Sequence, residues 1–139
     1  MFKIGIIREE KVPADKRSPL SPAQCQIVAS QFGVKIKVQQ SDVRVFRPEE
    51  YPQQAVEMVS KIDDCDILLG VKEVPIEKLI EGKTYFFFSH TIKEQEYNRA
   101  LLQTILKKKI RLIDYECLVD AETGQRIVAF GRYAGIVGA

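Results

Sequence analysis

The sequence has 139 residues, a length that fits a single domain with an ordinary hydrophobic core. Its 21 Lys and Arg nearly balance 19 Asp and Glu, and no basic stripe with interleaved aromatic residues occurs, so nucleic-acid binding is not expected. No apolar run approaches the roughly 18 residues that span a bilayer, so membrane insertion is not expected either.

Strand and helix patterns alternate along most of the chain. Short apolar runs predict strands at residues 2–7, 34–39, 66–71, 84–88 and 111–113. Helical patterns cover residues 22–32 and 94–109, with single turns at 48–51 and 75–80. Residues 55–62 fit a helix and a strand equally well. A hairpin around residues 122–124 predicts two further short strands, the second at 127–130.

Local signals set some of these boundaries and faces. Ser21 followed by Pro22 predicts a helix start, and Gly33 predicts its end. The alternation of apolar and polar residues at 34–39 is typical of a half-exposed strand, which we expect at the edge of a sheet. The apolar face of the first helix is predicted to be Ile27, Val28 and Phe32.

The repeated strand–helix order predicts an α/β fold: an open, mostly parallel, Rossmann-like sheet with helices on both faces. The whole chain, residues 1–139, is expected to form one domain. The three cysteines are far apart in apolar stretches and form no CxxC pair, so we expect buried free thiols in a reducing compartment. The first apolar run is too short for a signal peptide. A cytoplasmic protein is therefore predicted.

Polar side chains follow the predicted strands. In an open α/β sheet, ligands bind beyond the carboxyl ends of the strands, so these side chains mark a candidate site. In chain order they are Arg8, Arg17, Lys72, Glu73, Ser89, His90, Asp114, Tyr115 and Glu116. Arg17 suits a carboxylate, while Lys72 and His90 suit acid–base chemistry on a carbonyl or an imine. No cluster with metal-ligand spacing is present.

Each of these residues also has a structural interpretation. Arg17 can be a solvated loop arginine, and Lys72 with Glu73 can be a surface pair of little energetic consequence. His90 can be a partly buried helix-capping residue, and Glu116 can pair with a nearby Lys or Arg. The aromatic residues at 85–88 are expected in the core rather than in a stacking platform.

Five ordered motifs resemble a known superfamily. Arg8 with residues 16–22 (KRSPLSP), residues 68–75 (LLGVKEVP) and residues 86–93 (FFFSHTIK) are similar to segments of the alanine dehydrogenase and transhydrogenase superfamily. Residues 113–116 (IDYE) and 129–135 (AFGRYAG) resemble the lysine-forming saccharopine dehydrogenases, particularly the lysine–2-oxoglutarate reductase half of the bifunctional lysine-degrading enzyme.

The resemblance implies a reaction and a role for each matched residue. Lysine would condense with 2-oxoglutarate, and NADH or NADPH would reduce the imine to saccharopine, or the reverse. Lys72 and His90 would be the acid–base pair, and Glu73 and Glu116 would tune their pKa values. Arg17 and Arg8 would bind the substrate, with Arg17 holding a carboxylate. The interdomain or cofactor side would carry Phe130, Gly131, Tyr133 and Gly135.

One departure from the family pattern concerns the cofactor. No G-x-G-x-x-G follows a strand, and Gly131, Gly135 and Gly138 have the wrong spacing. We therefore expect no cofactor on this chain alone, with NAD or NADP bound mainly by a further domain, in the same chain after residue 139 or in a partner chain. A homo-oligomer is also compatible with the sequence.

Two alternatives for the function stay open: an alanine dehydrogenase-like enzyme with a smaller substrate, and a stand-alone module that binds an amino acid or oxo acid.

Overall fold

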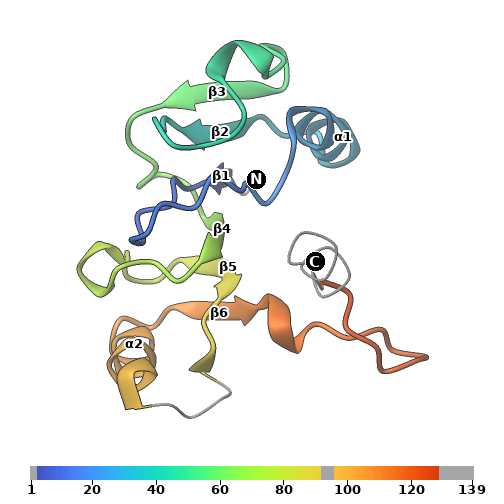
Figure 1. Ribbon diagram of the computed structural model, residues 1–139. Helices are drawn as coiled ribbons and strands as arrows, with labels where there is room; N and C mark the ends of the chain where they lie inside the picture. Colours follow the sequence, from blue (N-terminus) through green and yellow to red (C-terminus); the bar gives the residue numbers. More distant parts are fainter. Residues whose placement is uncertain (1–2, 92–95, 129–139) are drawn as a thin grey trace, which may run out of the picture.

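The computed structural model describes residues 3–91 and 96–128. It confirms the predicted α/β class: one six-stranded sheet, entirely parallel, in the order β3-β2-β1-β4-β5-β6 (Figure 1). The strands are β1 (Ile4–Ile6), β2 (Ile36–Gln39), β3 (Val56–Val59), β4 (Ile67–Lys72), β5 (Thr84–Phe88) and β6 (Arg111–Asp114). The order reverses between β1 and β4, so the loops that follow these two strands flank the point where such sheets bind ligands.

Two α-helices cover the sheet, one on each half (Figure 1). The first, α1 (Pro22–Phe32), begins at the predicted Ser21 cap and ends at Gly33, whose φ of 64° is in the left-handed region that glycine tolerates. The second is α2 (Glu96–Lys107). Three single 3-10 turns complete the described elements: η1 (Pro48–Glu50), η2 (Ile76–Lys78) and η4 (Tyr115–Cys117).

Each helix closes its own hydrophobic core. The core under α1 contains Ile6, Cys25, Ala29, Ile36, Val38, Tyr51, Ala55 and Val56. The core under α2 contains Ile7, Ile62, Cys65, Leu68, Leu79, Tyr85, Phe87, Leu101, Ile105 and Ile110. Ile6, the last residue of β1, belongs to the core under α1, and Ile7, which follows β1 directly, belongs to the core under α2, because successive extended residues point to opposite faces. The predicted core position of the aromatic residues in β5 is confirmed for Tyr85 and Phe87.

Several local predictions were wrong. The strand at β2 is not an edge strand, because residues 56–59 form β3 and take the edge. Helix α1 exposes Ile27 and Phe32 and buries Cys25 and Ala29 instead, since these smaller residues face the sheet. Cys25 and Cys65 are buried free thiols as predicted, but Cys117 is exposed because it ends the surface turn η4.

The predicted hairpin is shorter than expected. Up to residue 128, its two strands are reduced to one antiparallel bridge between Val119 and Arg126. The carboxylate of Asp120 accepts the backbone N–H groups of Glu122 and Thr123. These local hydrogen bonds stabilise the turn although the flanking strands do not form an extended ladder. Residues 129 and 130, the end of the predicted second strand, lie outside the described residues. No helix in the described part of the chain is long and apolar enough to cross a membrane.

Candidate active site

The predicted polar residues lie at one edge of the sheet. Lys72 is the last residue of β4, and Asp114 is the last residue of β6. Ser89 and His90 follow directly after β5. All three strands are parallel and neighbours in the sheet, so their carboxyl ends meet at the same edge. The loop after β1, which carries Arg17, reaches this edge beside β4.

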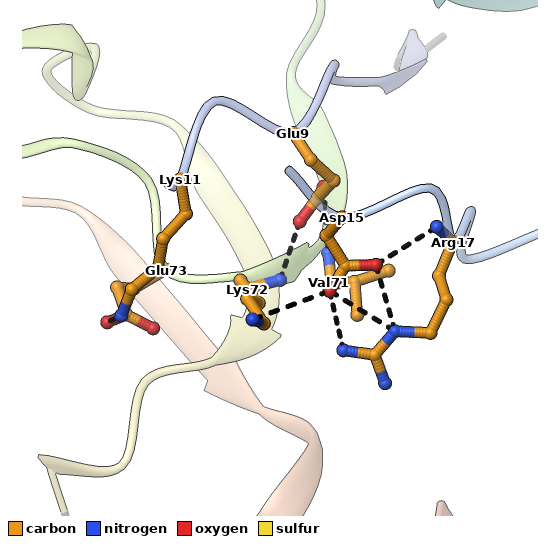
Figure 2. Close-up of polar contacts among 7 residues, drawn as sticks. All are labelled: Glu9, Lys11, Asp15, Arg17, Val71, Lys72 and Glu73. Atoms are coloured by element: carbon orange, nitrogen blue, oxygen red, sulfur yellow. Dashed lines mark hydrogen bonds and ion pairs between the residues drawn. The ribbon is translucent and has the colours of Figure 1, made fainter. Parts of the chain in front are cut away.

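A buried aspartate connects two of the predicted residues. Asp15 is 8% exposed, and its carboxylate accepts hydrogen bonds from the Arg17 side chain at 2.7 Å from a terminal nitrogen and 3.0 Å from Nε. The same carboxylate lies 3.8 Å from Lys72 Nζ. Figure 2 shows Asp15 between the two cations, one from the loop after β1 and one from the end of β4. The predicted proximity of Arg17 and Lys72 therefore depends on a residue that the sequence analysis did not select.

The positive charges of Arg17 and Lys72 favour the ionised form of the Asp15 carboxyl group. Hydrogen bonds from Arg17 keep the pKa of Asp15 below its ordinary value, and the nearby Lys72 acts in the same direction. The Asp15 carboxylate in turn raises the pKa of Arg17. A carboxylate that stays ionised between two cations can orient a lysine amine and keep it at the edge of the sheet. One sequence signal could have identified Asp15: it lies two residues before Arg17. This spacing lets the Asp15 side chain accept the Arg17 backbone N–H at 3.0 Å.

The end of β4 carries an irregularity that a second acid stabilises. The register between β4 and β5 shifts between Leu69 and Lys72. Glu9, from the loop after β1, accepts the backbone N–H of Val71 at 3.1 Å and that of Lys72 at 2.7 Å (Figure 2). Burial raises the pKa of Glu9 more than these hydrogen bonds lower it. Glu9 thus fixes the backbone of Lys72, another role that the sequence analysis missed.

Glu73 is placed differently from the surface pair considered above. Its carboxylate pairs with Lys11, and the two side chains lie on the far side of Lys72 from Arg17 in Figure 2. The carboxylate that contacts Lys72 Nζ is that of Asp15. A tuning effect of Glu73 on Lys72 would therefore act without a direct ion pair, and it stays a prediction.

His90 and Glu116 form the second predicted pair. Their buried facing atoms, Nδ1 and Oε2, are 3.6 Å apart. His90 has a left-handed backbone with φ of 59°, a conformation in which histidine is enriched among non-glycine residues. The placement agrees with the predicted closeness of the two residues; whether Glu116 tunes His90 stays a prediction.

Two pockets open beside the charged group. The larger, about 480 Å³, is mostly apolar and is lined by Arg17 together with Val71, Phe88 and Tyr115. The rings of Phe88 and Tyr115 are 5.0 Å apart, and burial raises the pKa of Tyr115. Phe88 and Tyr115 directly precede Ser89 and Glu116 in the sequence, but neither His90 nor Glu116 is among the residues that line this pocket.

The smaller pocket, about 210 Å³, contains Arg8. Its lining includes Lys72, Glu73 and Lys78, and Arg8 pairs with Glu10 at 2.7 Å. Arg8 and Arg17 therefore line different pockets.

Within the described residues, no group of three or more His, Cys, Asp or Glu is arranged to hold a metal ion. The residues predicted for the cofactor side, Phe130, Gly131, Tyr133 and Gly135, lie outside the described residues.

The described part of the chain lacks the glycine-rich turn that is typical of dinucleotide-binding folds. In folds that bind a dinucleotide at this edge, a glycine-rich turn joins the first strand directly to a helix N-terminus. Here β1 is followed by Arg8, Glu9 and Glu10, and α1 begins only at Pro22.

The described residues form a parallel α/β domain with charged side chains at one edge of its sheet and no glycine-rich turn after β1. The chain belongs to the family described as "Alanine dehydrogenase/PNT, N-terminal domain", whose model matches residues 5–137. The fold is also similar to the transhydrogenase from Sinorhizobium meliloti, with a TM-score of 0.68 at 15% identity, over 87% of this chain and 37% of that one.

Two groups of named relatives are similar in sequence. The mitochondrial alpha-aminoadipic semialdehyde synthase of Rattus norvegicus is 45% identical over 133 residues, which is 95% of this chain and 14% of that protein. The synthase of Arabidopsis thaliana is 35% identical, over 97% of this chain and 13% of that protein. The NAD(+)-dependent, L-lysine-forming saccharopine dehydrogenase of Emericella nidulans is 30% identical, over 96% of this chain and 36% of that protein. This chain thus spans between about a seventh and a third of these relatives.

Proposed function

We propose that this chain is the substrate-side domain of an NAD(P)-dependent enzyme that joins lysine and 2-oxoglutarate to form saccharopine, or cleaves saccharopine. The observation that carries the proposal is the Arg17–Asp15–Lys72 group at the switch point of the sheet, with His90 and Glu116 at the ends of the neighbouring strands. The names of the relatives support this choice of substrates.

The proposed chemistry needs proton transfer at two stages. The lysine amine attacks the C2 carbonyl carbon of 2-oxoglutarate, which gives a carbinolamine. Water is then lost as the hydroxyl group accepts a proton, and the C=N bond of the imine forms. Lys72 and His90 are assigned to these proton transfers, because an amine and an imidazole can each donate and accept a proton. The nicotinamide cofactor supplies hydride chemistry when bound.

Substrate holding is assigned to the larger pocket. A guanidinium at the edge of an apolar pocket suits a ligand that combines a carboxylate with a methylene chain. Asp15 orients the Arg17 fork by binding Nε and one terminal nitrogen. Nucleotide binding is assigned to a further domain, in the same chain or in a partner chain; the absence of a glycine-rich turn between β1 and α1 supports this assignment.

The test uses a polypeptide in which this domain is joined to a nucleotide-binding domain. Lysine, 2-oxoglutarate and each reduced cofactor are supplied, and cofactor oxidation is followed. Lys72→Met and His90→Gln are each expected to lower kcat by about 100-fold or more, because an acid–base group is lost. Lys61→Met, at an exposed position, is the matched control and should retain activity.

Three results would contradict the proposal. Wild-type rates in either variant would remove Lys72 or His90 from the chemistry. Turnover with pyruvate and ammonia, but not with lysine and 2-oxoglutarate, would favour an alanine dehydrogenase-like reaction. Substrate binding without turnover in the presence of either cofactor would favour a binding module.

A further inference from the structure

We propose that Asp114 positions His90 and Glu116 against each other, acting from behind the pair without touching substrate. Asp114 ends β6 and is 8% exposed. Its Oδ2 accepts the backbone N–H of Ser89 at 3.1 Å and the Ser89 hydroxyl, while its Oδ1 accepts the backbone N–H of Glu116 at 2.8 Å. One buried carboxylate therefore joins the residue before His90 to Glu116 itself.

The contacts on the β5 side control where the imidazole lies. Ser89 is completely buried, so its position is set by Asp114 and by the core around it. Immediately afterwards, the backbone of His90 turns into the left-handed region, which costs free energy for a residue with a Cβ and persists only where neighbours hold it. Asn98, a buried residue of α2, donates its side-chain N–H to the His90 carbonyl at 3.0 Å. Asp114 and Asn98 thus hold the turn at its two ends.

The contacts on the β6 side control the partner. By accepting the Glu116 N–H, Asp114 begins the turn η4 and sets the direction in which the Glu116 side chain leaves the strand end. That side chain places Oε2 3.6 Å from His90 Nδ1. Because the same carboxylate fixes both backbones, a change at Asp114 must alter the distance between the two side chains even though it contacts neither.

The chemistry of the position favours a carboxylate over an amide. Three donors converge on Asp114, and an ionised carboxyl group accepts at both oxygens. In Asp114→Asn, the amide offers one oxygen and turns an NH2 group towards a backbone N–H. At least one buried donor then loses its acceptor, and the two strand ends are no longer tied by a common group.

The structural test exploits the single histidine of the sequence. In the 139-residue chain, the imidazole resonances observed by NMR at one fixed pH belong to His90 alone. Glu116→Gln defines the change expected when the facing carboxylate is altered. Asp114→Asn is expected to shift the same resonances in the same direction. In the double variant the shift should be smaller than the sum of the two single shifts, because both substitutions act on the same contact.

A matched control comes from the same part of the chain. Asp120 also accepts two backbone N–H groups, those of Glu122 and Thr123 at 2.8 and 2.9 Å, but in an exposed turn away from His90. Asp120→Asn should leave the imidazole resonances unchanged. If Asp114→Asn fails to fold, Ser89→Ala removes the hydroxyl contact to Asp114, together with the contacts of that hydroxyl to Thr91, and should shift the resonances in the same direction.

The results separate this inference from the proposed function, on which its catalytic consequence rests. Unchanged resonances in folded Asp114→Asn, or an equal shift in Asp120→Asn, would overturn the positioning role whatever the activity. In the enzyme that includes a nucleotide-binding domain, Asp114→Asn should lower kcat by about tenfold to 100-fold with a smaller change in KM, as expected for a misplaced catalytic group. Shifted resonances with wild-type kcat would leave the positioning intact and contradict the catalytic role of His90.

Discussion

Replacing Asp15 by Asn tests whether a single buried charge assembles the Arg17–Lys72 group. The substitution keeps the size of the side chain and removes the negative charge between the two cations. Asp64→Asn is a matched control: the Asp64 carboxylate also lies between two lysines, Lys37 and Lys3, but on the exposed surface.

The expected loss of stability follows from the contacts. A hydrogen bond to a charged group contributes roughly 1.5–3 kcal/mol when it is buried. The Asp15 side chain is only 7% exposed, but that of Arg17 is 47% exposed, so solvent screening moves the contribution towards the value of about 1 kcal/mol for surface pairs. We expect Asp15→Asn to cost about 1–2 kcal/mol. At about 2.1 cal/mol/K of unfolding entropy per residue, each kcal/mol lowers the Tm of 139 residues by about 3 °C.

The direction of the Asp15 pKa shift predicts how the stability effect of Asp15→Asn changes with pH. The pKa of Asp15 is held below its ordinary value of 3.8, chiefly by hydrogen bonds from Arg17. Its contribution to the free energy of unfolding is therefore present above pH 3.8 and is lost as the pH falls through the lower, folded-state pKa. The stability difference between wild type and Asp15→Asn should be full at pH 7 and shrink below about pH 3.8.

The assay is urea unfolding of both variants and wild type across this pH range, with and without added salt. Salt should weaken the effect of Asp64→Asn more than that of Asp15→Asn, since exposed pairs are screened more strongly. Equal stabilities of wild type and Asp15→Asn at pH 7, or a difference that grows at acid pH, would refute the reasoning.

Three further predictions concern the ligand, the core and the thiols. Arg17→Ala in the complete enzyme should raise the KM for 2-oxoglutarate by more than that for the nucleotide; equal effects would argue against carboxylate binding. Gly5→Ala should destabilise the chain by about 1–3 kcal/mol in thermal unfolding, because the new Cβ would lie 2.6 Å from Ile62 Cδ1 in the packed core, and Ile62→Val should recover part of the loss. Cys117 should react rapidly with a thiol reagent while the other two cysteines, buried and with their pKa raised to about 11, react slowly; three equally fast thiols would contradict the described core.

The sequence was sufficient for the fold class because its signals are local and mutually consistent. Apolar runs separated by helical patterns are compatible with few topologies other than a parallel sheet, and the Ser21 and Gly33 signals placed the ends of α1 within a residue. The sequence was insufficient for predicting which face of α1 is buried. Ile27 and Phe32 are more hydrophobic than Cys25 and Ala29, yet the angle at which α1 packs on the sheet buries the smaller pair.

Some residues of the candidate site could likewise be predicted from the sequence, and others could not. Lys72, His90 and Glu116 were predictable because the carboxyl ends of parallel strands meet at one edge, whatever the loops do. Asp15, Glu9 and the positioning contacts of Asp114 were not, because an acid in a loop has no periodicity to reveal which cation or backbone N–H it meets.

The sequence by itself thus determined the α/β class, most of the order of strands and helices, and the chemical groups at the strand ends. Only the tertiary structure decided how those groups are paired: Asp15 between Arg17 and Lys72, and His90 against Glu116. The physical reason is that hydrophobic periodicity is written along the chain, whereas a charge finds its partner across space, through loops whose paths depend on the packing of the whole sheet.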